Sequence, residues 1–259
     1  MQDISTCTLL LIHQMSLSVS DEVLFISDLH IALEKPEITH RFLDFLTNRV
    51  TKSSTLYILG DLFDAWIGDD DPTPPNNKIR EQLKKITSSG VKIFLLQGNR
   101  DFLLGKKFAA DTGVILLDDY AIINLFGTQT LLTHGDLLCT DDLPYQAFRI
   151  KSHSPEWQQS ILSKPLLLRL LAARWYRIRS YFHKRKKSQD IMDVNQATVI
   201  KVMKDFNCLR LIHGHTHRPD IHCFELQDQS ASRFVLAAWS NSTGEVLSWN
   251  NQGYHREII

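Results

Sequence analysis

Five short apolar runs in this chain each end in a cluster of polar residues of the kind that bind metal ions. The runs are rich in β-branched and aromatic residues, and their length suits strands that are buried on both faces. Because sites in α/β folds assemble at the carboxyl ends of strands, we expect the polar clusters to lie together. The clusters are Asp28-Leu29-His30, Gly60-Asp61-Leu62-Phe63-Asp64, Gly98-Asn99-Arg100-Asp101, His134-Gly135-Asp136 and Gly214-His215-Thr216-His217.

The order of strand and helix patterns predicts a layered α/β core. One helix is expected to begin at Pro36, where apolar residues recur at helical spacing, and another to span Asn76–Ser89 and stop before Gly90. A hairpin closed by a glycine-containing turn is expected over 246–259. The expected strands cover residues 23–27, 56–60, 92–98, 130–133, 210–212 and 233–239.

Length and composition are those of a globular protein with one large domain or a domain with an insertion. The chain has 259 residues, of which 43% are hydrophobic and 22% charged. No apolar run reaches the roughly 20 residues that a membrane-spanning helix needs. The four cysteines show no CxxC spacing, which favours a reducing compartment. Residues 1–20 are interpreted as a peripheral N-terminal extension, with Met15 as an alternative start.

A basic, leucine-rich segment interrupts the pattern of strands. We interpret residues 141–190 as a helical insertion between two parts of one core, 21–140 and 191–259. Between Trp157 and Gln189 the chain has nine Lys or Arg residues and no Asp or Glu, whereas the rest has 20 basic residues against 29 acidic ones. A positive patch on an acidic body predicts an anionic partner at one place. The alternative is an amphipathic helical pair whose basic side is merely solvated.

The donor types in the five clusters favour a centre of two metal ions. Imidazole, carboxylate and amide oxygen ligands suit Mn²⁺, Zn²⁺ or Fe rather than a thiolate-bound metal. A paired site needs a carboxylate that bridges the two ions and open positions for water and substrate. Any one motif would be weak evidence, but five in this order make accident improbable. His213 is assigned a structural role, and Asp69-Asp70-Asp71 is interpreted as a solvated acidic turn.

The order DxH, GDxxD, GN, H and GHxH resembles the calcineurin-like metallophosphoesterases. That resemblance implies a two-sheet sandwich flanked by helices, with two ions that share Asp61. It assigns one ion to Asp28, His30, Asp61 and His217, and the other to Asp61, Asn99, His134 and His215. It also implies catalytic roles for Asp61, Asn99 and Arg100.

Arg100 departs from the pattern of many such enzymes, which have histidine after the GN asparagine. A histidine there can protonate an alkoxide leaving group, whereas arginine stays charged at any working pH. A phosphate leaving group needs no general acid, and a guanidinium can grip its oxygens instead. Arg100 therefore predicts cleavage of a pyrophosphate bond.

Longer stretches resemble a narrower family, the UDP-2,3-diacylglucosamine diphosphatases of the lipid A pathway. These stretches are 57–71, 98–105, 134–142, 191–195 and 211–219. The resemblance implies hydrolysis of UDP-2,3-diacylglucosamine to 2,3-diacylglucosamine 1-phosphate (lipid X) and UMP by a metal-bound hydroxide, usually with Mn²⁺. It also implies a peripheral protein on the anionic cytoplasmic face of the bacterial inner membrane. We expect a monomer that does not bind nucleic acid.

The same resemblance assigns residues that contact the substrate. Lys184 departs in type, since relatives can carry Asn there. The assigned substrate contacts are Asn99, Arg100, Asp142, Ser180, Lys184, Lys187 and His215. The aromatic residues expected to line the acyl pocket are Trp66, Phe102, Tyr145 and Phe148.

Two other functions use the same motifs. A metal-dependent nuclease or cyclic-nucleotide phosphodiesterase would bind phosphates along the basic helix, but it predicts a general acid after Asn99 and a polar insertion. A non-catalytic scaffold of the same fold predicts lost ligands. Arg100 and the leucine-rich insertion oppose the first alternative, and the complete ligand set opposes the second.

Overall fold

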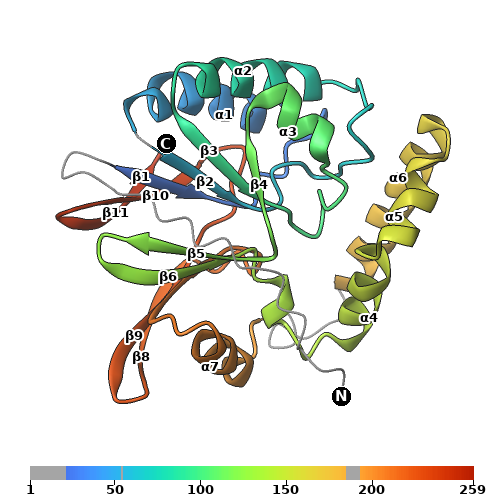
Figure 1. Ribbon diagram of the computed structural model, residues 1–259. Helices are drawn as coiled ribbons and strands as arrows, with labels where there is room; N and C mark the ends of the chain where they lie inside the picture. Colours follow the sequence, from blue (N-terminus) through green and yellow to red (C-terminus); the bar gives the residue numbers. More distant parts are fainter. Residues whose placement is uncertain (1–21, 54, 185–192) are drawn as a thin grey trace.

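The computed structural model describes residues 22–53, 55–184 and 193–259, with the backbone alone for 178–184 (Figure 1). Its strands form two sheets. The first has six strands in the order β11-β10-β1-β2-β3-β4, and the second has five in the order β5-β6-β7-β9-β8. The extension that we expected over residues 1–20 lies outside the described residues.

Strands β1 to β4 of the first sheet run parallel, and β10 pairs antiparallel with both β1 and β11. In the second sheet β7 is parallel to β6 and β9, and β5 and β8 complete antiparallel hairpins at the edges. The first sheet contains β1 (Val23–Ile26), β2 (Thr55–Leu59), β3 (Lys92–Leu96), β4 (Ile115–Leu117), β10 (Glu245–Asn250) and β11 (Gly253–Ile258). The second contains β5 (Tyr120–Leu125), β6 (Thr128–Thr133), β7 (Arg210–His213), β8 (Asp220–Leu226) and β9 (Gln229–Val235).

Helices cover the outer faces of the two sheets (Figure 1). Three of them, α1 (Pro36–Asn48), α2 (Asn76–Ser88) and α3 (Lys106–Thr112), lie on the first sheet, and α7 (Gln196–Asp205) lies on the second. The remaining three, α4 (Leu143–Ser152), α5 (Pro155–Leu162) and α6 (Leu166–Lys184), stand to one side of the sandwich. They occupy the segment in which the sequence predicts inserted helices.

The apolar runs are unbroken because the central strands are buried on both faces. In β1, Leu24 and Ile26 pack toward the helices, whereas Val23 and Phe25 pack toward the second sheet. All four side chains are at most 1% exposed. The predicted two-sheet sandwich with flanking helices is confirmed, and its double burial explains the lack of polar alternation.

Strand β9 begins and ends four residues earlier than the sequence predicts. Gln227 and Asp228 both have positive φ angles, and they form a tight turn that pairs Leu226 with Gln229. The apolar run continues to Trp239, whose backbone N–H donates to Asp28 O over 3.1 Å. Leu236 and Trp239 are apolar because they are buried in the core, although they lie outside the strand. The sequence also gives no expectation of α3, α7, β4, β5 or β8.

Arg49 joins the end of α1 to the two ends of the described core. Its guanidinium forms two hydrogen bonds with Glu22, both of 2.7 Å, and two with Glu257 on β11, of 2.6 and 2.9 Å. Hydrogen bonds from Arg49 hold the pKa of Glu257 below its usual range. A carboxyl group with a lowered pKa stabilises the fold at neutral pH, and that contribution is lost as pH falls through the lowered pKa.

We therefore expect Arg49→Gln to lower the free energy of unfolding by about 1 kcal/mol at pH 7, since water screens this partly exposed network. The difference from the wild type should shrink at pH 3. Urea denaturation at the two pH values measures it. Lys107→Gln is the control, because its exposed pair with Asp111 should contribute little at either pH. An unchanged difference at pH 3 would contradict the role of Glu257.

Candidate metal centre

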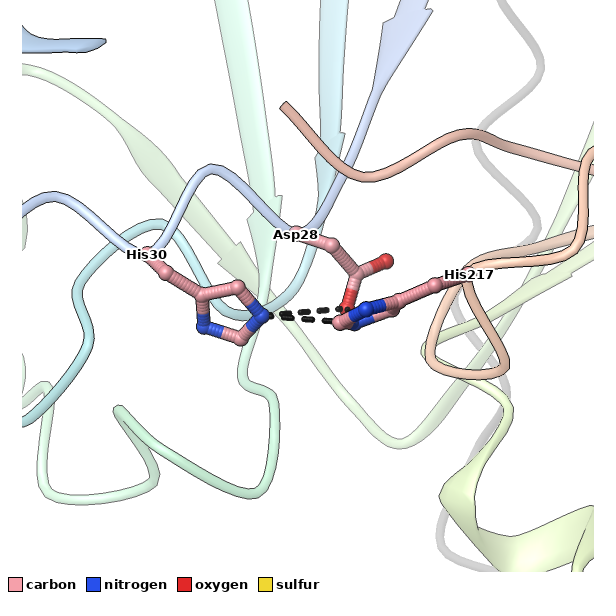
Figure 2. A group of neighbouring side chains, drawn as sticks. All are labelled: Asp28, His30 and His217. Carbon is pink, nitrogen blue, oxygen red and sulfur yellow. Dashed lines mark hydrogen bonds and ion pairs between the residues drawn. The ribbon is translucent and has the colours of Figure 1, made fainter. Parts of the chain in front are cut away.

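Asp28, His30 and His217 point toward one another (Figure 2). His217 Nε2 lies 3.2 Å from Asp28 Oδ1 and 3.3 Å from His30 Nε2. Asp28 is completely buried, whereas the side chain of His217 is 39% exposed. The three side chains come from the loops after β1 and β7, which are nearly 190 residues apart in the chain. They form one half of a site with an open side.

Asn99, His134 and His215 form a second cluster beside the first. Asn99 Oδ1 is 3.1 Å from His134 Nε2 and 2.9 Å from His215 Nδ1, and these two ring nitrogens are 3.3 Å apart. Asp61 lies between the clusters, with its Oδ2 3.7 Å from His30 Nδ1 and 3.8 Å from His134 Nε2. The structure thus brings all seven predicted ligands together, with the predicted bridging carboxylate in the middle.

Several of these residues have a backbone conformation that is rare for residues other than glycine. Left-handed φ angles are found at five of the seven predicted ligands, and each costs of order 1–3 kcal/mol. Such strain persists where the surrounding structure demands it, and it gathers at functional sites. The five are Asp28 (φ 55°), His30 (φ 50°), Asp61 (φ 52°), His215 (φ 68°) and His217 (φ 56°).

The glycines of the motifs are needed for space. A Cβ atom on Gly60 would overlap the ring of His134, and one on Gly98 would overlap the carboxylate and backbone of Asp61. A Cβ on Gly214 would overlap Asp28 in the same way. Each glycine therefore lets one loop approach a ligand on another loop.

Neighbouring groups hold the ligands in orientation. The ring of His134 donates from Nδ1 to Leu59 O over 2.8 Å, so that Nε2 is the nitrogen that faces the cluster. The buried carboxylate of Asp101 accepts from the backbone N–H groups of Gly98, over 2.8 Å, and Phe63, over 3.2 Å. It thereby joins the loops after β2 and β3.

Burial and charge oppose one another in the centre. Burial raises the pKa of Asp61 to about 8, with nearby Asp101 and Asp28 adding to the effect. Burial would lower the pKa of His134, but the carboxylates of Asp61 and Asp28 raise it to about 9. Burial also lowers the pKa of His30 well below its usual range. With these pKa values Asp61 and His134 hold protons at neutral pH, and a bound divalent cation would take the place of those protons.

The residues present fit divalent cations. Two overlapping groups, Asp28–His30–His217 and Asp28–Asp61–His134, each have donor atoms within 4.8 Å of one another. Nδ1 of His30 is buried and has no hydrogen-bond partner among the described residues. Carboxylate, imidazole and amide oxygen donors without thiolates suit first-row divalent ions.

Comparison with known proteins agrees with this donor set. The family model for calcineurin-like phosphoesterases matches residues 22–219. Proteins named UDP-2,3-diacylglucosamine hydrolase are 46% identical over 233 residues in Aliivibrio fischeri, 48% over 223 in Salmonella paratyphi C and 49% over 216 in Escherichia coli K12. The aligned parts cover 90%, 86% and 83% of this chain and 96%, 93% and 90% of the relatives. The chain belongs to the calcineurin-like phosphoesterases, among the UDP-2,3-diacylglucosamine hydrolases.

Two of the predicted substrate contacts of this phosphoesterase have described side chains outside the metal clusters. Arg100 donates its backbone N–H to Asp61 Oδ1 over 2.7 Å, and its positive charge partly opposes the rise that burial causes in the pKa of Asp61. Asp142 caps α4 by accepting from the N–H of Tyr145 over 3.2 Å. Ser180 and Lys184 belong to α6 but have no described side chains, and Lys187 lies outside the described residues.

The aromatic residues predicted to line an acyl pocket divide into two groups. Phe102 stacks on His153 at 4.9 Å, and Phe148 stacks on Tyr176 of α6 at 4.7 Å, both in the region of α4 to α6. The ring of Tyr145 lies 6.1 Å from that of His215. Trp66 is instead a core residue, packed against Phe63 and Phe108 and 2% exposed.

The expectation of a solvated acidic turn at Asp69-Asp70-Asp71 is wrong for Asp69 and Asp71, whereas the side chain of Asp70 is 61% exposed. Asp69 accepts from the N–H groups of Gly105, over 3.0 Å, and Phe108, over 2.9 Å, and so fixes the start of α3. Asp71 is buried and accepts from Thr73 and Asn76. Aspartate two residues before threonine with an intervening proline is a local signal for such a turn.

Basic residues of α6 dock onto the loop after β2, a contact that the sequence does not reveal. Arg169 is 5% exposed and donates to Ile67 O over 2.6 Å and to Asp70 over 2.8 Å. Arg177 forms an ion pair with Asp64 of the GDxxD motif. On the other side, Arg149 of α4 donates to Asp136 of the HGD motif over 2.7 Å. The helices α4 and α6 are thus attached to two of the metal-binding loops.

Proposed function

We propose that this protein hydrolyses the pyrophosphate bond of UDP-2,3-diacylglucosamine to give 2,3-diacylglucosamine 1-phosphate and UMP, in lipid A biosynthesis. The observation that carries the proposal is the complete two-cluster donor set beside Arg100. The relatives named for this substrate support it, because they align over most of both chains. The full ligand set also argues against a scaffold without activity.

The proposed centre holds two divalent ions, most simply Mn²⁺. One ion position would use Asp28, His30, Asp61 and His217, and the other Asp61, Asn99, His134 and His215. When bound, such ions act as Lewis acids on phosphate oxygens and make water a nucleophile at neutral pH. Asp61 would contribute to both ion positions, and Asn99, which belongs to the second position, directly precedes Arg100 in the chain.

Arg100 is the residue that selects the bond. Its backbone N–H donates to the carboxylate of Asp61 over 2.7 Å, which places the residue beside the centre where an anionic group would bind. A guanidinium stabilises negative charge that develops on phosphate oxygens but does not donate its proton. The leaving sugar phosphate needs charge stabilisation and no proton, which matches arginine at this position.

We further propose that α6 seats the protein on an anionic membrane surface at the cytoplasmic face of the inner membrane. Leucines 167, 168 and 171 are 53–66% exposed, and Trp175 is 60% exposed. The same helix carries exposed Arg174, and Lys164 precedes it. Apolar and cationic residues together favour the interface of an anionic bilayer. Within the described residues, no helix is long and apolar enough to cross a membrane.

Replacing Leu167, Leu171 and Trp175 by serine is expected to weaken binding to phosphatidylglycerol vesicles by at least about 10-fold, since each side chain loses apolar contact with the bilayer. Vesicle sedimentation measures the change. Ile258→Ser is the matched control, because Ile258 is 68% exposed but lies on β11, away from α6. Equal binding by the triple variant and the wild type would exclude α6 as the membrane surface.

The substrate is tested by measuring UMP release. The purified protein with Mn²⁺ receives UDP-2,3-diacylglucosamine, UDP-N-acetylglucosamine or bis(p-nitrophenyl) phosphate in parallel. We expect UMP from the acylated substrate and little cleavage of the other two. Cleavage of the generic diester alone would favour a nuclease or cyclic-nucleotide phosphodiesterase and would refute the proposal. No cleavage of any substrate in the presence of bound metal would favour a scaffold.

A further inference from the structure

His213 is a buried histidine that lies outside the two ligand clusters. It ends β7, its side chain is completely buried, and it immediately precedes the Gly214-His215-Thr216-His217 loop. Its ring also borders the loop after β6, since a Cβ on Gly135 would lie 2.8 Å from His213 Nδ1. The ring therefore sits between the loops that carry His134 and His215.

The partner of His213 is an arginine that is itself buried. Arg233 on β9 is 5% exposed, and its Nη1 lies 3.2 Å from His213 Nε2. Its Nε has no hydrogen-bond partner among the described residues. Burying a guanidinium in this way is costly, and buried polar groups are retained in some proteins because they specify one geometry.

The partners of the ring determine where its proton is. Arginine can only donate, so His213 Nε2 must accept. The proton of the neutral ring is then on Nδ1, which lies 2.9 Å from Gly214 O and donates to it. The chemistry of the two partners therefore selects a single tautomer and leaves neither ring nitrogen free to change its role.

The carbonyl of Gly214 accepts two hydrogen bonds at the start of the loop. It accepts from His213 Nδ1 and also from the N–H of Thr216 over 2.8 Å. The N–H of the same glycine donates to His134 O over 2.9 Å. Hydrogen bonds thus fix both the N–H and the carbonyl of Gly214. His215 and His217, which follow it in the loop, have left-handed φ angles.

We infer that His213 and Arg233 are a pair of positioning residues, which hold the Gly214 carbonyl and thereby set the strained loop that presents His215 and His217. The pair does not touch substrate. The pair acts through the loop, and the inference rests on the metal centre of the proposed function. Groups of this kind behind metal ligands typically contribute 10- to 100-fold in metal affinity.

The first test measures the tautomer directly. Ring ¹⁵N chemical shifts of the metal-free, histidine-labelled protein report which nitrogen of His213 is protonated, with His213→Leu used to assign the signals. We expect Nδ1–H and an unprotonated Nε2. In Arg233→Met the preference should weaken, because nothing then requires Nε2 to accept. A wild-type ring protonated on Nε2 would overturn the inference.

The second test measures Mn²⁺ affinity by calorimetry. We expect Arg233→Met to lower the affinity about 10-fold or more, and Arg233→Lys to restore most of it by keeping a donor to Nε2. Arg210→Met is the matched control, because Arg210 is a half-buried arginine at the opposite end of β7 that stacks on Trp249 at 4.2 Å. Both methionine variants should lower stability to a similar extent, but only Arg233→Met should change metal affinity.

Wild-type affinity in Arg233→Met would overturn the pair as positioning residues. If the wild type itself failed to bind Mn²⁺, the metal centre of the proposed function would be refuted instead, and the tautomer measurement would still decide the pair. The two failures are therefore distinguishable.

Discussion

Asp61→Ala is expected to lose activity by at least about 10³-fold while the protein stays folded, because one carboxylate serves both proposed ion positions. The Oδ2 atom of Asp61 lies between His30 Nδ1 and His134 Nε2 at 3.7 and 3.8 Å, within reach of both proposed ion positions. Burial raises its pKa to about 8, so the metal-free fold keeps this carboxyl protonated at neutral pH although the unfolded chain would ionise it, and this difference lowers the stability of the metal-free fold. The metal-free variant should therefore unfold at a temperature no lower than the wild type.

Metal content and the metal-dependent rise in unfolding temperature separate the loss of a metal ligand from a loss of folding. The wild type should gain stability from Mn²⁺ by mass action, and Asp61→Ala should lose most of that gain. Asp71→Ala is the control, since Asp71 is also a buried aspartate, and among the described residues its carboxylate accepts hydrogen bonds only from Thr73 and Asn76. It should lose stability and keep its metal. Retained turnover in Asp61→Ala would refute the ligand assignment.

Arg100 should control which bond is cleaved. We expect Arg100→Met to lower kcat/KM for the pyrophosphate substrate by about 10²- to 10³-fold, the usual cost of removing one group that stabilises transition-state charge. Arg100→His should lose a similar factor on that substrate but gain relative to Arg100→Met on a phosphodiester with an alkoxide leaving group, because imidazole can donate a proton.

Arg41→Met provides the control for loss of an arginine. Arg41 donates to the carbonyls of Ser240 and Asn241, which belong to neither ligand cluster, and its loss should leave both activities unchanged. An Arg100→His variant with no relative gain on the alkoxide diester would contradict the argument that the residue after Asn99 selects the leaving group. Metal content should match the wild type in both Arg100 variants, which excludes a loss of ligands as the cause.

The sequence allowed the fold class and the ligand types to be predicted, because both depend on local patterns. Uninterrupted apolar runs identified β1, β2 and β3, and glycine-flanked polar residues identified their ends. The end of β9 could not be found in this way, because Trp239 is apolar for packing outside the strand. Trp66 shows the same ambiguity, since an aromatic residue near a motif can line a pocket or fill the core, and only its contacts with Phe63 and Phe108 decide.

Charges were the least predictable feature. The acidic run that begins at Asp69 looks solvated in the sequence, yet its carboxylates hold α3, the start of α2 and Arg169 of α6. Arg177 likewise reads as one of nine cations in a basic segment, although it forms an ion pair with Asp64. The partner of a charged residue is set by long-range packing, which composition does not contain.

By itself, the sequence determined which residues can bind metal, that each follows a strand, and that arginine stands where a proton donor could be. These features are chemical identities and local spacings, which can be read without knowledge of the fold. Only the tertiary structure decided that Asp61 lies between the two clusters, that α4 and α6 are attached to the metal-binding loops, and that Arg233 contacts His213. Those facts depend on sheet order and register, which bring together residues that are far apart in the chain.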